Sequence, residues 1–222
     1  MGGTADTSAR REGLRERNRR RTATELESSA LRLFTEKGYD AVTIDDIAAE
    51  AGVSRRTFFR YFATKEDVLF SDNAERLAEL RQALSARPSD EPVLSALRHA
   101  LLSMAGDYEE ERERIFQRAK IIRTAPGLLG KALANQRVWE EAMSELVAQR
   151  LGVDPAVDLR PSVAAGTTLA AIRSAVTLWV AGGGSAYLPT LAAEAMDLLD
   201  GGLQIGEHPP ARRRGRRAPA DD

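Results

Sequence analysis

The feature that most constrains this 222-residue chain is its hydrophobic periodicity. Apolar residues recur at i, i+3 and i+4 along most of the sequence, whereas the alternation typical of a half-buried strand does not recur. Prolines lie at or near the boundaries of these periodic segments, where a missing N–H does least harm, at positions 126, 155, 161 and 189. We therefore predict an all-α protein of about nine helices, long enough to bury a core.

The periodicity and the composition divide the chain into four parts. We expect an Arg-rich arm over residues 1–21 and a basic tail with Pro and Gly over residues 204–222 to be disordered when free. Between them we expect a three-helix domain over 22–68 and a larger helical domain over 69–203. The individual helices are expected over 22–37, 44–51, 55–62, 65–87, 93–106, 109–123, 127–151, 162–181 and 190–199.

The residue types present argue against several kinds of chemistry. The chain has no cysteine, which excludes disulfides and thiolate metal sites, and its two histidines form no metal-ligand or triad pattern. We therefore expect no cofactor, no metal and no enzymatic activity. The N-terminus has no apolar segment after its charges, which favours a cytoplasmic protein. The apolar run from Val163 to Gly184 contains Arg173, which favours a buried helix over a membrane span.

Capping signals place two short helices around a tight turn. Thr43 can cap a helix that starts at Ile44, with Asp46 three residues after the cap in the position of a capping-box carboxylate. Gly52 ends that helix, and Ser54 can cap the next one. Two short helices joined by a turn that contains glycine form the helix-turn-helix pattern.

Positive charge is clustered near that pattern, although the net charge of the chain is only −1. One cluster is GVSRRTFFRYFATKED, from Gly52 to Asp67, which holds three arginines, one lysine and four aromatic rings. Helical spacing puts Phe58 and Phe62 on one face, where we expect them to be core. One interpretation of the remaining faces is a solvated basic helix. We favour the alternative, a helix that enters the major groove of DNA with its N-terminal end, because the basic face has no acid.

The stretch from Ala30 to Leu69 resembles the DNA-binding domain of the TetR family of bacterial transcriptional repressors. The similarity lies in F-x-x-x-G-Y at 34–39, T-I-x-x-I-A-x-x-A-G-V-S at 43–54 and T-F-F-R-Y-F-x-x-K-E-D at 57–67. This resemblance implies a homodimer whose two recognition helices meet successive major grooves of a near-palindromic operator. It places the DNA contacts at Thr43, Arg55, Arg56, Thr57, Phe59, Tyr61 and Lys65.

The resemblance also implies a division of roles among these contacts. Arg55, Arg56 and Thr57 would read bases, whereas Tyr61 and Lys65 would mainly contact phosphates. The Arg-rich arm is either a minor-groove contact, as in some relatives, or a solvated tail, and the sequence leaves both open.

The domain over 69–203 is expected to bind an effector and to dimerise. In the family that the chain resembles, helices in the places of 162–181 and 190–199 build the dimer interface. The helices from 93 to 151 are expected to enclose a ligand pocket, although such a stripe of Met and aromatic residues is more often plain core. The candidate ligand-binding residues are Leu102, Phe116, Arg118, Ile122, Trp139, Met143, Arg173, Val176 and Trp179. The arginines need an acid such as Glu140 or Glu145, or else an anionic ligand.

The same region loosely resembles the mycofactocin-regulator branch of the family, which implies an acyl-coenzyme A-like effector. The sequence therefore predicts a ligand-responsive transcriptional regulator, a repressor that a hydrophobic small molecule releases from a palindromic operator. A DNA-binding protein without sequence preference is one alternative, and the balanced net charge argues against it. A helical enzyme is the other.

Overall fold

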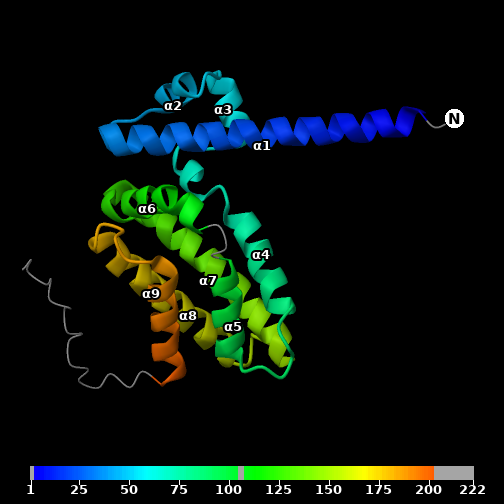
Figure 1. Cartoon of the computed structure of the whole chain (residues 1–222), viewed down its shortest axis with the longest axis vertical. Helices are drawn as coiled ribbons and strands as arrows, with labels where there is room; N and C mark the ends of the chain where they lie inside the picture. Colours follow the sequence, from blue (N-terminus) through cyan, green and yellow to red (C-terminus); the bar gives the residue numbers. More distant parts are fainter. Residues whose placement is uncertain (1–2, 105–107, 203–222) are drawn as a thin grey trace, which may run out of the picture.

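The computed structural model describes residues 3–104 and 108–202 (Figure 1). In these ranges the chain forms nine α-helices, two short 3-10 helices labelled η, and no strand. The predicted all-α class with about nine helices is confirmed. The predicted basic tail over 204–222 lies outside the described residues.

The helices form an upper and a lower group along the long axis of the molecule (Figure 1). The upper group contains α1 (Gly3–Lys37), α2 (Ile44–Glu50) and α3 (Arg55–Tyr61), and η1 (Glu66–Phe70) leads out of it. The lower group contains α4 (Asn73–Ser85), α5 (Val93–Ser103), α6 (Tyr108–Thr124), η2 (Pro126–Leu128), α7 (Leu129–Leu151), α8 (Arg160–Ala181) and α9 (Leu188–Asp200). Within the lower group, α6 lies next to α1 (Figure 1).

The first helix is longer than its predicted range of 22–37. α1 begins at Gly3 and so includes residues 3–21, and the expectation that this arm is disordered when free stays a prediction. Residues 3–21 contain no proline and hold seven arginines, two alanines and two glutamates, which favour a helix, so that a helix nucleated further along the chain continues through them. The N-terminal part of α1 projects beyond α2 and α3 (Figure 1).

The helix predicted over 65–87 is interrupted. η1 ends at Phe70 and α4 begins at Asn73, with Ser71 and Asp72 between them. Side chains of Ser, Asp and Asn compete for backbone groups, and the Ser71 hydroxyl donates to the carbonyl of Val68 over 3.2 Å. The interruption lets the chain leave the upper group before α4 runs down the lower one (Figure 1). The later predicted helices are all found, with ends that differ by at most three residues.

The described chain has two hydrophobic cores. The first joins α1, α2 and α3 around the fully buried Leu26 and Phe58, and it extends to Ile121 of α6 and Leu128 of η2. Burial of Phe58 and Phe62 confirms their predicted core role. The second core joins α4, α5, α7 and α8 and includes Leu80, Leu97, Met143, Val147 and Ala165. Because the first core reaches α6 and η2, the helix-turn-helix domain packs directly on the lower group.

The helix that the sequence predicts to be buried, α8, is buried on one side only. Ala165 and Trp179 are buried, whereas Val163 and Leu178 are 51% and 62% exposed. Among the described helices, α8 alone has the length and apolar composition of a membrane span, and 22% of that span is buried in the single chain. In the single chain the prediction of a buried helix therefore holds for one face of α8, and the other face is exposed.

Candidate DNA-binding site and interdomain joint

The turn between α2 and α3 is fixed by local hydrogen bonds. The Thr43 N–H donates to the Asp46 carboxylate over 2.9 Å, and the Asp46 N–H donates to the Thr43 hydroxyl over 3.2 Å. This is the predicted capping box, and the hydrogen bond from the Thr43 side chain is the main cause that holds the pKa of Asp46 below its usual value. Gly52 has a φ of 66°, which would strain any L side chain. Local bonds therefore set the direction of α3.

α3 has a buried face and an exposed face. The Ser54 hydroxyl caps the helix by accepting the Thr57 N–H over 3.1 Å, as predicted. Phe58 is fully buried, and its ring centre lies 5.6 Å from that of Phe62. Phe59, on the outside, is 46% exposed. Phe58 and Phe62 thus fix the helix to the core, whereas Phe59 lies on the exposed face together with the arginines.

The arginines of α3 have weak partners or none. Arg55 Nη1 lies 2.6 Å from Asp45 Oδ2, and both side chains are more than half exposed. Such a pair contributes about 1 kcal/mol or less, so a phosphate or a base can replace it. Arg56 is exposed and makes no ion pair within the described residues. Arg60, to which the sequence assigns no role, lies over the Tyr61 ring at 5.1 Å from its centre.

Lys65 is more enclosed than the sequence suggests. Its Nζ donates to the backbone carbonyls of Tyr39 and Val42 over 2.9 and 3.0 Å, and it lies 4.2 Å from the centre of the Tyr39 ring. The Tyr39 hydroxyl donates to Glu66, and burial together with that carboxylate raises the pKa of Tyr39 well above its ordinary value. Lys65 therefore stabilises the loop between α1 and α2, and one of its three ammonium protons is left for a phosphate.

Five of the seven predicted DNA contacts lie in α3, from Arg55 to Tyr61. Of the other two, Thr43 caps α2 and Lys65 directly precedes η1. Thr57 is half-buried, and its hydroxyl lies 2.9 Å from that of Ser54. The assignment of individual residues to bases or phosphates stays a prediction.

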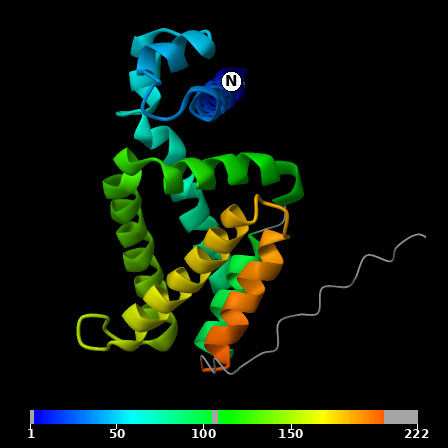
Figure 2. The same ribbon diagram turned by 90° about the vertical axis from the view of Figure 1, so that its left-hand side faces the viewer.

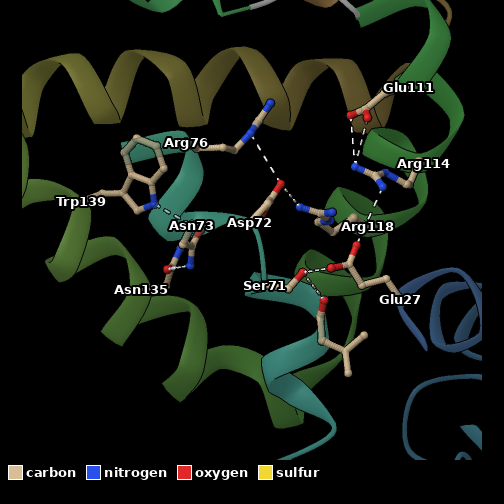
Figure 3. A network of polar contacts seen from close by, with 11 residues as sticks. Glu27, Ser71, Asp72, Asn73, Arg76, Glu111, Arg114, Arg118, Asn135 and Trp139 are labelled. Carbon is tan, nitrogen blue, oxygen red and sulfur yellow. Dashed lines mark hydrogen bonds and ion pairs between the residues drawn. The ribbon is translucent and has the colours of Figure 1, made fainter. Parts of the chain in front are cut away.

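Three consecutive residues, Ser71, Asp72 and Asn73, connect the upper group to the lower one, and we call them the joint (Figure 3). The Ser71 hydroxyl donates to the carboxylate of Glu27 on α1. Asp72 Oδ2 accepts a 2.6 Å hydrogen bond from Arg118 Nη1 on α6. The joint therefore ties α1, the longest helix of the upper group, to α6 of the lower group.

Asn73 extends the joint to α7 (Figure 3). Its side-chain amide donates to Asn135, and its side-chain oxygen accepts the indole N–H of Trp139 over 3.3 Å. Trp139 is one of the predicted ligand-binding residues. Since Asn73 is also the first residue of α4, these bonds fix the start of that helix against α7.

Two arginines of α6 contribute to the same network. Arg118 pairs with Asp72, and Arg114 lies 3.2 Å from Glu111 on its own helix and 3.8 Å from Glu27 on α1. Within the described chain, the buried Nε atoms of both arginines have no hydrogen-bond partner. Arg118 therefore neutralises an acid of the joint, and Arg114 is shared between Glu111 of α6 and Glu27 of the upper group.

The other predicted ligand residues lie in different surroundings. Met143 and Trp179 are at most 1% exposed, and the Phe116 ring meets Trp179 edge to face at 5.3 Å between centres. Arg173 is exposed on α8. Half-buried positions are taken by Leu102, Phe116, Ile122, Trp139 and Val176. Their role in a ligand pocket stays a prediction, and sequence reasoning misses Asp72, Asn73 and Asn135 because no motif marks them.

The fold and the basic face of α3 define the class of protein: a helix-turn-helix regulator with a helical second domain. Residues 28–71 match the bacterial regulatory proteins of the tetR family, and residues 91–204 match the MftR C-terminal domain. The chain belongs to the TetR family and is a DNA-binding transcriptional regulator. The resemblance seen in the sequence is thereby confirmed.

Relatives and solved structures agree with this assignment. The mycofactocin biosynthesis transcriptional regulator MftR of Mycobacterium tuberculosis is 33% identical over 187 residues, which cover 84% of this chain and 93% of MftR. The regulator TcmR of Streptomyces glaucescens is 34% identical over 155 residues, 67% of this chain and 69% of TcmR. The TetR-family repressor FadR of Thermus thermophilus, solved with lauroyl-CoA, has a TM-score of 0.54 at 22% identity over 85% of this chain and 98% of FadR. At that identity FadR supports the fold alone.

Proposed function

We propose that this protein is a homodimeric repressor which an acyl thioester of the acyl-coenzyme A type releases from a near-palindromic operator. The observation that carries the proposal is the joint. Its three residues contact α1 on one side and α6 and α7 on the other (Figure 3). A ligand that displaces α6 or α7 must therefore either move α1 or break these contacts.

Dimerisation is supported by the apolar surface of the last two helices. Val163 and Leu178 of α8 and Leu198 of α9 are each more than half exposed in the single chain. Covering this surface with a second copy removes apolar area from water, which is the main driving force for obligate dimers. The two recognition helices then have to lie about 34–36 Å apart, one turn of DNA, to reach successive major grooves.

Sequence reading is proposed for the exposed N-terminal end of α3. Arg56 is the main candidate, because an exposed guanidinium without an acid partner is free to form a bidentate pair with guanine O6 and N7. Arg55 and Thr57 are proposed as further base contacts. Thr43, Tyr61 and Lys65 are proposed as phosphate contacts, and Phe59 as a contact to the backbone or a thymine methyl group.

Release follows from thermodynamic coupling. An effector that binds better when α6 and α7 are displaced favours a state in which the Asp72–Arg118 contact is altered and the two DNA-binding domains lose their spacing. Affinity for DNA then falls by the same factor by which DNA weakens effector binding. The acyl thioester class is what the resemblance to the mycofactocin-regulator branch implies, and the match to the MftR C-terminal domain supports that resemblance.

The proposal is tested by footprinting and fluorescence anisotropy on the promoter beside the protein's own gene. We expect protection of one short inverted repeat by a dimer, and a fall in affinity when acyl-coenzyme A of medium or long chain is added. Equal protection of random DNA would favour a protein without sequence preference. An unchanged DNA affinity across the whole acyl series would remove the acyl thioester as the effector.

A further inference from the structure

A surface groove of about 380 Å³ lies between the C-terminal half of α6 and the C-terminal end of α8. Figure 2 shows the end of α8 reaching α6. From α6 the groove is lined by Phe116, Lys120, Arg123 and Thr124, and from the end of α8 by Val180 and Ala181. The volume is in the range of small-molecule sites, which is about 300–1,000 Å³.

Both walls of this groove come from acid-free sequence. Residues 114–139 contain six Lys and Arg and no Asp or Glu, and residues 159–193 also contain no acid. Any neutralising carboxylate must therefore come from another part of the chain. A groove with charge of one sign and apolar walls concentrates ligands of the opposite sign.

Along α6, two of the basic side chains have carboxylate partners, whereas the basic side chains nearer the C-terminal end have none within the described residues. Arg114 and Arg118, in the first half of the helix, pair with Glu27 and Asp72. In the second half, Lys120 has no acid partner among the described residues, and Arg123 donates only to a neutral hydroxyl, that of Thr177, over 2.8 Å. Arg173, one turn before Thr177 on α8, is exposed and also lacks an acid partner in the described ranges. Within the described residues, therefore, no carboxylate pairs with the positive charge at the groove.

The apolar side of the groove is held in place by packing. The Phe116 ring lies edge to face on the buried Trp179, 5.3 Å between centres. On its other side is Gly184, which has a φ of 71° and where an added Cβ would come within 2.8 Å of the ring. Phe116 can take this position only because residue 184 has no side chain, so the ring is a fixed part of the wall.

We infer that this groove binds the phosphorylated head of the acyl thioester effector, with its phosphates on Lys120 and Arg123 and its apolar part against Phe116. A guanidinium fork and an ammonium are the two groups that proteins use most often for phosphate. The inference rests on the proposed function and adds the place of the effector's anionic end. The phosphorylated end of the effector would then lie away from the joint, where Arg118 is already paired with Asp72.

The test compares three probes, lauroyl-CoA, free coenzyme A and laurate, by calorimetry on the full-length dimer. In Lys120→Gln/Arg123→Gln we expect lauroyl-CoA and coenzyme A to bind about tenfold to a hundredfold more weakly, because two charge-assisted hydrogen bonds are lost. Laurate, which has no phosphate, should change by less than about threefold. The matched control is Arg81→Gln/Arg137→Gln, which removes the same charge from two exposed arginines outside the groove.

The outcomes separate the site from the proposed function. Unchanged binding of lauroyl-CoA in the groove variant, equal loss in the control variant, or no binding of either coenzyme A probe by the wild type overturns the site. Circular dichroism and a melting curve show whether the variant is folded, and Arg123→Lys, which keeps the charge, should recover part of the affinity. Binding that depends on Lys120 and Arg123 without release of DNA would support the site and contradict the release mechanism. If lauroyl-CoA released DNA equally well from the groove variant and from the wild type, the release mechanism would be supported and the site would be contradicted.

Discussion

The DNA-binding end of the molecule and the joint differ in how far apart in the sequence their contacting residues are. At the DNA-binding end, the caps pair residues only three positions apart, as in Thr43 and Asp46. In the joint, the bonds to α1, α6 and α7 link residues 44 to 66 positions apart, as in Asp72 and Arg118. Local bonds give α3 a shape that depends little on the rest of the chain. The bonds from Ser71 and Asp72 to α1 and α6 form only while the two helical groups keep their relative position, so a shift of the lower group acts on them first.

The largest effect is expected in the core that fixes the recognition helix. Phe58→Ala should lower the free energy of unfolding by about 3–5 kcal/mol, because a fully buried ring leaves a cavity. Phe59→Ala, one residue further on and 46% exposed, should change it by about 0.5 kcal/mol or less. Urea denaturation of both variants measures the difference. Similar losses would mean that α3 does not have the two faces described above.

The next largest effect distinguishes the joint from an ordinary surface pair. A double-mutant cycle with Asp72→Asn and Arg118→Gln should give a coupling free energy of about 1–3 kcal/mol, since both side chains are mostly buried. The control cycle uses Arg98 and Asp197, which lie 2.7 Å apart but are more exposed and should give about 0.2–1 kcal/mol. The joint variants should also change how strongly the effector weakens DNA binding. Equal coupling in both cycles would contradict a special role for the joint.

A smaller and more specific effect is expected at the DNA surface. Arg56→Ala should lose about 1–3 kcal/mol of discrimination at one base position and bind the remaining operator normally. Lys65→Ala should weaken binding to every sequence and lower the salt slope by about one. Anisotropy titrations on operator and random DNA at several salt concentrations separate the two variants. Base reading by Arg56 is excluded if its loss is as large on random DNA as on the operator.

The smallest effect concerns a local cluster far from the DNA. Hydrogen bonds from Arg87, and then from Ser95 and His99, lower the pKa of Glu91 from 4.5 to about 2. Because the folded pKa is below the unfolded one, this stabilisation is present above about pH 4.5 and is lost as the pH falls towards 2. The Glu91→Gln variant should therefore have a lower melting temperature than the wild type at pH 7. This difference in melting temperature should become smaller as the pH is lowered. Operator affinity at pH 7 should not change, because these contacts are local and lie outside the joint.

Sequence patterns are sufficient to predict a contact when its two residues are close together in the sequence. The capping box at Thr43, the cap at Ser54 and the buried face with Phe58 all follow from spacing and residue type. Patterns fail where a partner is distant, because nothing around Arg118 indicates that Asp72 will be its acid.

Two further differences between the sequence-based predictions and the structure, in α1 and in α8, have other physical causes. Composition predicts disorder before Thr22, whereas helix propensity without an interrupting proline extends α1 to Gly3. Hydropathy marks α8 as a buried helix, but it cannot tell a core from a surface that a second copy could cover, and Leu178 is 62% exposed.

The length of α1 has a mechanical consequence. The helix is 35 residues long, and Glu27, its contact with the joint, lies 24 residues from the first and ten from the last. At 1.5 Å per residue the two arms measure about 36 and 15 Å. A tilt of about 5° around Glu27 would thus move the free end by about 3 Å and the end beside α2 by about 1 Å. α1 is an unequal lever, and a fluorophore on its long arm would magnify a rotation that is hard to see at the recognition helix.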